Sequence, residues 1–224
     1  MPNLKDLKNR INSVTSTKKI TQAMQMVAAA KRRRAEEAAD AARPYADRFN
    51  AVMAGLASGA DDNAPRLLSG TGSDQTHLLV VMTSERGLCG GFNTNIVKKA
   101  KNRAQALLGD GKTVKIITVG KKGREQIKRE YGDYVVDHVD LSEVKRVGYT
   151  NAQDIADAVL SRFDAGEFDV ATIFYSRFES VVSQIPTELQ IIPATFEESE
   201  DATSTLFDYA PGEDEILTEL LPRG

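Results

Sequence analysis

The sequence predicts an α/β protein: a long N-terminal coiled-coil helix, then a small Rossmann-like α/β domain, then the start of a C-terminal helix. Three observations support this prediction. Apolar residues recur every three or four positions in the first segment, short apolar runs alternate with helical patterns in the middle, and an acidic turn introduces the closing run ILTELL. Because that last pattern stops at LPRG, we expect the C-terminal helix to be truncated.

The long helix is predicted over residues 1–57. Its apolar stripe is strong at both ends and weaker between them, where small and polar residues occupy the seam. Pro44 lacks a backbone N–H and bends a helix, but the pattern continues beyond it, so we favour one kinked helix over two. At about 1.5 Å per residue the helix is roughly 80 Å long, so most of it protrudes and its stripe needs a partner helix. The stripe residues are Leu4, Leu7, Ile11, Val14, Ala38, Ala42, Tyr45, Phe49, Val52 and Leu56.

The α/β domain is predicted over residues 76–195, where strand and helix patterns alternate. The first two strand candidates are each followed by a helical pattern, and the last two form an antiparallel pair at the edge of the sheet. The candidates are HLLVVMT, TVKIITVG, YVVDHVDL, DVATIFYSRFES and VVSQIPTELQIIPA. Residues 58–75, rich in Gly, Ser, Asp and Asn, are predicted to be a linker. Residues 196–224 are predicted to form an acidic connector and the start of the C-terminal coiled-coil helix.

The net charge of -3 conceals an asymmetry, because the first sixty residues are basic and the segment from Phe196 onward is acidic. A single cysteine cannot form an internal disulfide, which favours the cytosol. No apolar run approaches the roughly 20 residues of a membrane helix, and the start MPNLKDLKNR lacks the apolar stretch of a signal peptide. We therefore expect no direct membrane insertion and only an indirect membrane association.

The glycine-rich loop SERGLCGGFN follows a strand and precedes a helix, which is where open α/β sheets bind ligands. It matches neither GxGxxG nor GxxxxGK[ST], and no acidic residue is placed to hold a ribose. The second glycine loop, VGKKG, has the same defect. A turn between strand and helix explains both loops, and nucleotide binding stays as the alternative.

Cys89 lies inside this loop, where a nucleophile would need a base within reach. The two histidines, His77 at the start of a strand and His138 in a polar run, are not placed near it by any pattern. Two histidines and one cysteine also lack the spacing of a metal site. We therefore expect no catalytic residue, no metal and no cofactor, and we interpret Cys89 as an exposed contact residue.

The basic run Lys31–Arg34 has three interpretations. Four adjacent cations suit a nucleic-acid phosphate chain, but no aromatic residues interleave them for base stacking. They also suit a solvated helix face. The interpretation we prefer is a shaft, because successive cations point around much of the helix and meet acidic groups of a surrounding ring at several angles.

Three stretches together resemble the gamma subunit of F-type ATP synthases: LKDLKNRINSVTSTKKITQAMQMVAAAKRRRAEEA, SERGLCGGFN and LFDYAPGEDEILTELLPR. The resemblance covers the whole chain in order, and KKITQAMQMVAAAK and RGLCGG are its most distinctive motifs. The chain departs from the family at its end, where members continue into a second long helix. The lack of a transit peptide favours a bacterial protein over a mitochondrial precursor.

The resemblance implies a central-stalk rotor. In this family the coiled coil stands inside the hexameric head of alpha and beta subunits (alpha3beta3), and the α/β foot sits with the epsilon subunit on the membrane c-ring. Proton flow turns the ring, the foot transmits torque, and the shaft moves the catalytic subunits through successive conformations. The implied location is the cytoplasmic face of the bacterial inner membrane, as a peripheral protein. No bond is made or broken on this chain, and the catalytic subunits hold the nucleotide.

The same resemblance implies contact roles for particular residues. Rotor–stator contacts are implied for Met24, Lys31, Arg34, Arg86, Leu88, Cys89, Gly90, Lys98 and Lys101. Proximity to the c-ring is implied for Phe207, Asp208 and Tyr209. Without the resemblance, the leading alternative is a small α/β nucleotide-binding enzyme with a coiled-coil arm, followed by a basic helical nucleic-acid binder.

Overall fold

The computed structural model describes residues 3–58, 64–196 and 220. The chain divides into two compact units, residues 1–52 and residues 53–224. The predicted residues Phe207, Asp208 and Tyr209, and most of the predicted connector and C-terminal helix, lie outside the described residues.

Helix α1 spans Leu4–Ser58 and runs through Pro44 without a break in its assignment. The prediction of one helix in place of two is therefore confirmed. Its N-terminal stripe is open to solvent: Leu4 is 83% exposed and Val14 is 68% exposed. Apolar side chains that stay exposed contribute no burial free energy, which is why we expect this stripe to pack against a partner helix. No partner helix lies among the described residues, and the expectation stays a prediction.

The second unit contains one five-stranded sheet in the order β3-β2-β1-β4-β5. The first four of these strands run parallel, and β5 pairs antiparallel with β4. The strands are β1 (Thr76–Met82), β2 (Thr113–Val119), β3 (Val135–Val139), β4 (Val170–Phe178) and β5 (Gln184–Ile192). The α/β prediction and the predicted antiparallel pair at the edge are confirmed.

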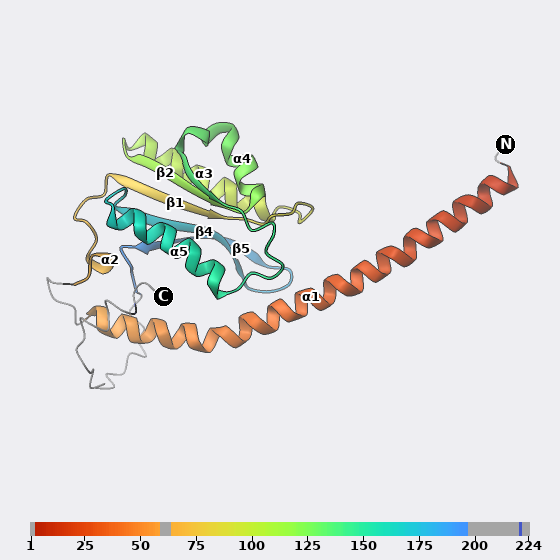
Figure 1. The fold of residues 1–224 in the computed structure, drawn as a ribbon, viewed down its shortest axis with the longest axis horizontal. Coiled ribbons are helices and arrows are strands. Elements are labelled where there is room, and N and C mark those ends of the chain that lie inside the picture. Colours follow the sequence, from red (N-terminus) through yellow and green to blue (C-terminus); the bar gives the residue numbers. More distant parts are fainter. Residues whose placement is uncertain (1–2, 59–63, 197–219, 221–224) are drawn as a thin grey trace. The chain divides into compact units, whose positions relative to one another are not determined.

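Helices cover both faces of the sheet (Figure 1). One face packs against α3 and α4, around buried Ile96, Ala104 and Ile127. The other face packs against α5, around buried Val159 and Phe163. The helices of this unit are α2 (Arg66–Ser69), α3 (Phe92–Gly109), α4 (Lys121–Tyr131) and α5 (Tyr149–Asp164), with a 3-10 turn at Gly132–Tyr134.

Strand β1 is central and buried on both faces, which explains its continuous apolar sequence. Its neighbours β2 and β4 run parallel to it, so the loops that follow these three strands meet at one edge of the sheet. From β3 the chain passes through α5 to β4 on the other side of β1, so the direction of strand succession changes beside β1. Open α/β sheets use such a position for ligand or partner contacts.

The predicted linker is not wholly irregular, because it contains α2. The carbonyl oxygen of Leu67 in α2 accepts a hydrogen bond from the amide of Ala194, just after β5, at 2.8 Å. Leu67 also packs against the core on the α5 face. This contact ties the segment before β1 to the end of the sheet.

Candidate functional site

The loop between β1 and α3 is organised by one buried side chain, Asn93, which is 5% exposed. Its Oδ1 accepts the amide of Ser84 at 2.9 Å, and its Nδ2 lies 3.2 Å from the sulfur of Cys89. Nδ2 also donates to the carbonyl oxygen of Arg86 at 3.4 Å. A single amide thus holds both sides of the loop, so the loop has a defined conformation.

The tip of this loop presents Leu88, whose side chain is fully exposed at 109% of its reference area. Leu88 also has φ of 61°, in the left-handed region that residues other than glycine avoid. Such a conformation costs roughly 1–2 kcal/mol for an L-residue. Gly90, at φ 60°, adopts the same region without that cost. An apolar side chain held out in an unfavourable conformation is typical of a contact surface.

Cys89 is exposed and free, and it lies beside Leu88 and Arg86 on the same loop. The imidazole of His138 lies instead with Thr118, whose Oγ1 is 2.9 Å from His138 Nδ1. The ring of His77 lies with Asp74, at the other edge of the sheet. In the described part of the chain, no group of three or more His, Cys, Asp or Glu residues could hold a metal ion.

In the second glycine loop, VGKKG at the start of α4, side chains of the protein itself accept the backbone amides. Glu85 accepts the amide of Lys121 at 3.1 Å through one carboxylate oxygen and the amide of Leu141 at 2.8 Å through the other. The hydroxyl of Thr83 accepts the amide of Gly123 at 2.8 Å. The amides of Lys121 and Gly123 belong to the first turn of α4, where a bound phosphate would be held. Glu85 therefore takes the place of an anionic ligand at this helix start.

Gly120 makes this arrangement possible. It has φ of 88°, and a Cβ at this position would overlap the carbonyl oxygen of Thr83. The glycine is required by close backbone approach between the ends of β1 and β2. This geometry supports the interpretation of VGKKG as a turn.

The two predicted lysines of α3 differ in their surroundings. Lys98 is exposed and makes no ion pair within the described residues. Lys101 is 22% exposed, its Nζ lies 2.9 Å from Glu130 Oε1 on α4, and it stands 5.9 Å from the ring centre of Tyr131. Lys101 is thus already occupied inside the α/β unit.

The predicted residues of α1 lie in the first unit. Met24 is 67% exposed. Within the basic run, Arg32 and Arg33 pair with glutamates one turn further along the helix, at 3.8 and 2.9 Å. Lys31 and Arg34 are exposed and have no ion pair among the described residues. The structure therefore leaves free the two cations that the resemblance singled out.

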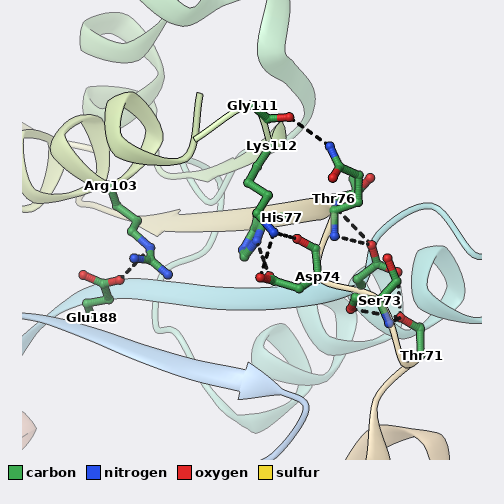
Figure 2. A network of polar contacts seen from close by, with 11 residues as sticks. Thr71, Ser73, Asp74, Thr76, His77, Arg103, Gly111, Lys112 and Glu188 are labelled. Carbon is green, nitrogen blue, oxygen red and sulfur yellow. Dashed lines mark hydrogen bonds and ion pairs between the residues drawn. The ribbon is translucent and has the colours of Figure 1, made fainter. Parts of the chain in front are cut away.

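A polar network at the opposite edge of the sheet was not predicted (Figure 2). His77 is 3% exposed, and its Nε2 lies 2.7 Å from Asp74 Oδ1, although neither ring nitrogen is aligned for a regular hydrogen bond with a described residue. Lys112 Nζ lies 2.8 Å from the other oxygen of Asp74. The hydrogen bond from Lys112, opposed by desolvation and assisted by the nearby His77, holds the pKa of Asp74 below its ordinary value.

Asp169 organises the same edge. Its Oδ1 accepts the hydroxyl of Thr71 at 2.6 Å, and its Oδ2 accepts the amides of Gln75 and Thr76 at 3.0 and 2.9 Å. The Thr71 hydroxyl is the main cause of the lowered pKa of Asp169, and the two amides add to it. No local pattern could have indicated this contact, because Asp169 and Thr71 are 98 residues apart.

Comparison with known proteins identifies the family. A family model described as ATP synthase matches residues 3–224. The ATP synthase gamma chain of Dinoroseobacter shibae is 70% identical over 226 residues, which cover 100% of this chain and 78% of that protein. The gamma chain of Paracoccus denitrificans is 69% identical over 225 residues, with the same coverage. The chain belongs to the ATP synthase gamma chain family.

A similar fold is found in a chain of the central stalk and c-ring structure of Tetrahymena thermophila mitochondrial ATP synthase. The TM-score is 0.52 at 22% identity, over 79% of this chain and 82% of that chain. This likeness concerns the fold alone. The family predicted from the motifs is confirmed, and the contact roles of individual residues remain predictions. No helix in the described part of this gamma-chain family member is long and apolar enough to cross a membrane.

Proposed function

We propose that the chain is a rotor subunit of the central stalk that couples rotation of a membrane c-ring to conformational changes in the catalytic alpha3beta3 head. The observation that carries the proposal is its 70% identity, over its whole length, to a protein named ATP synthase gamma chain. The chain itself is proposed to be non-catalytic, with the epsilon subunit as a further partner of the α/β unit. It acts as a peripheral protein on the cytoplasmic face of the bacterial inner membrane.

The loop after β1 is the proposed head-facing contact, formed by Arg86, Leu88, Cys89 and Gly90 beside an acidic loop of a catalytic subunit. Its geometry supports this role. Leu88 is fully exposed, and the hydrogen bonds of Asn93 fix the conformation of the loop. The Leu88 side chain is therefore held in solvent, where a partner can contact it. Pre-organised contacts lose little conformational entropy on binding.

The cations on α1 and α3 are proposed to meet acidic stator groups during rotation. Lys31, Arg34 and Lys98 are exposed and unpaired within the described residues, so they are available for such contacts. Lys101 first has to leave Glu130, and we expect it to contribute less. Met24 supplies an exposed, flexible apolar surface on the shaft. Phe207, Asp208 and Tyr209 are proposed to lie near the c-ring.

Replacing Leu88 by glycine tests the loop contact with the least effect on folding. Glycine adopts the positive φ of this position freely, so the substitution removes the side chain and the backbone cost together. In an assembled enzyme that contains the full-length gamma chain, we expect Leu88→Gly to lower proton-driven ATP synthesis in vesicles. Nucleotide occupancy of the catalytic subunits should be unchanged.

The matched control is Val182→Ser, which alters another strongly exposed apolar side chain, 95% exposed, between β4 and β5. This position lies outside the proposed contact loop, so synthesis should stay close to that of the parent enzyme. Equal losses in both variants, or full synthesis by Leu88→Gly, would show that Leu88 is not a coupling contact.

A further inference from the structure

Glu85 stands between β1 and the contact loop, which is residues 86–90. Its side chain is half-buried, and its carboxylate forms no ion pair with any described residue. Both oxygens accept backbone amides instead: Oε2 accepts that of Lys121 at 3.1 Å, and Oε1 accepts that of Leu141 at 2.8 Å. Because these two amides follow β2 and β3, one side chain joins the loops after three neighbouring strands.

The two preceding residues strengthen the same connection. The Thr83 hydroxyl accepts the amide of Gly123 at 2.8 Å and donates to the carbonyl oxygen of Val119 at 3.1 Å. The carbonyl oxygen of Ser84 accepts the amide of Lys122 at 3.2 Å. The segment that leads into the contact loop is therefore bonded at three consecutive residues to elements outside its own strand.

On its other side, the contact loop is closed by Asn93 of α3. The Asn93 side chain bonds to the amide of Ser84 before the loop and lies 3.2 Å from the sulfur of Cys89 within it. Asn93 therefore fixes the internal shape of the loop. Glu85 bonds to other elements, so it fixes the direction in which the loop points from the sheet.

We propose that Glu85 is a positioning residue for the head contact. Its carboxylate holds the contact loop to α4 and to the segment after β3, so that a load on Leu88 is carried by three strands and does not swing the loop about the end of β1. This proposal rests on the function proposed above for the contact loop. The charge of Glu85 is not the contact group, because the proposed partner is an acidic loop that a free carboxylate would repel.

The test is a double-mutant cycle in an assembled enzyme that contains the full-length gamma chain. Glu85→Ala, Leu88→Gly and the double variant are compared for proton-driven ATP synthesis in vesicles. We expect Glu85→Ala to lower synthesis, at most as far as Leu88→Gly does, while nucleotide occupancy of the catalytic subunits is kept. Because Glu85 acts through Leu88, the double variant should lose no more synthesis than Leu88→Gly alone. A role in general stability would instead add its loss to that of Leu88→Gly.

Glu85→Gln separates the acceptor oxygens from the charge. Glutamine keeps the length of the side chain and one oxygen for an amide, but it places an NH2 group against the other amide. We expect a smaller loss of synthesis than in Glu85→Ala. If only the charge mattered, both variants would change synthesis equally. Glu143→Ala is the matched control, because it removes an exposed carboxylate after β3 that bonds to no described residue, and it should synthesise ATP like the parent.

Hydrogen exchange of the full chain tests the geometry without the assembled enzyme. In Glu85→Ala the amides of Lys121 and Leu141 should exchange at least about tenfold faster, because each loses a charged acceptor. The amide of Ser84 donates to Asn93 and should stay protected, since the loop keeps its own shape. Equal acceleration at Ser84 would show that Glu85 maintains the fold of the loop and not its direction, which would overturn the proposal.

The synthesis assay separates this proposal from the one on which it rests. Unchanged synthesis in Leu88→Gly would refute the loop contact itself, and the role of Glu85 with it. If Leu88→Gly loses synthesis, the role of Glu85 alone is overturned by parent-like synthesis in Glu85→Ala, by losses that multiply in the double variant, or by equal alanine and glutamine variants. If Glu85→Ala does not assemble, the same cycle is run with Glu85→Gln, whose loss should disappear once Leu88 is replaced. Losses in both single variants with no further loss in the double variant would confirm the proposal.

Discussion

Asp169 provides the sharpest test of how the α/β unit is held together. It lies immediately before β4, and its carboxylate accepts one hydroxyl and two amides from the segment that enters β1, including those of Thr71 and Thr76. Its own amide donates to the carbonyl oxygen of Thr76 at 2.8 Å. Removing the carboxylate therefore leaves three donors without their acceptor and loosens the start of the central strand.

The expected loss can be bounded. A hydrogen bond to a charged group contributes about 1.5–3 kcal/mol net, but the three bonds share one acceptor and are not additive. Asp169 is half-buried, so water replaces part of what is lost. We expect Asp169→Ala to lower the free energy of unfolding by about 2–4 kcal/mol. Asp169→Asn keeps the shape, with its oxygen toward the two amides and its NH2 toward Thr71 Oγ1, and should cost about 1 kcal/mol.

The dependence on pH follows from the lowered pKa of Asp169. Because the folded-state pKa lies below the ordinary value of 3.8, the ionised carboxylate stabilises the fold above that pH. This contribution is lost as pH falls through the folded-state pKa. The difference in unfolding free energy between the parent chain and Asp169→Asn should therefore shrink under acid conditions.

The measurement is urea unfolding of the chain followed by near-ultraviolet circular dichroism, combined with hydrogen exchange at the amides of Gln75 and Thr76. Asp157→Ala is the control, since Asp157 is an exposed carboxylate of α5 and its loss should change stability by less than about 0.5 kcal/mol. If the asparagine and alanine variants are equally unstable, the acceptor geometry is not what holds the segment. Unchanged exchange at both amides in Asp169→Ala would refute the reasoning altogether.

Three further predictions use other contacts. Arg162 lies 2.7 Å from Asp137, and its hydrogen bond is the main cause of the lowered pKa of that carboxyl. Arg162→Ala should therefore cost about 1–2 kcal/mol in urea unfolding at neutral pH, and less as acid protonates Asp137. Gly120→Ala should lower the free energy of unfolding by at least about 3 kcal/mol, because of backbone strain and overlap of the new Cβ with Thr83. The control is Gly109→Ala, whose new Cβ has no atom within 4 Å, and it should be neutral or slightly stabilising in the same urea unfolding. In an assembled enzyme with a full-length gamma chain, we compare replacement of all four cations, Lys31, Arg34, Lys98 and Lys101, by glutamate with their replacement by glutamine. At low salt the glutamate variant should lose more ATP synthesis than the glutamine variant, while the catalytic subunits keep their nucleotide occupancy. If the glutamate variant synthesises ATP as fast as the parent enzyme, these cations are only a solvated helix face.

The elements of the fold could be predicted because their signals are local. The run HLLVVMT is apolar throughout because β1 is buried on both faces, and the helical patterns repeat with the period of a helix that has one buried side. The antiparallel pair was predictable from two strand-like runs joined by a short segment. Pro44 did not end α1, because the helical pattern on both sides outweighs one missing hydrogen bond.

The contacts that define the candidate site could not be predicted in this way. Glu85 reaches the amides of Lys121 and Leu141, which are 36 and 56 residues away, and the sequence marks Glu85 only as the residue before RGLCGG. Asn93 ends the quoted loop SERGLCGGFN, and no local pattern indicates that it is buried and holds the loop. Long-range hydrogen bonds depend on the order of the strands in the sheet, and no periodic pattern in the sequence predicts that order.

Lys101 shows how the fold decides which residues of a motif are available for contacts. Along α3 it is three residues from Lys98, so the two lysines lie on neighbouring positions of one helix surface. Only Lys101 reaches Glu130, because α4 packs beside α3 on the same face of the sheet. A partner's carboxylate would have to replace that ion pair at Lys101, and it would meet Lys98 with no such competition. The same reasoning separates Lys31 and Arg34 from Arg32 and Arg33, whose glutamate partners lie one helical turn away. Contacts with a partner should therefore depend mainly on the cations that have no ion pair within the chain. In the basic run and in α3, these cations are fewer than the sequence alone suggests.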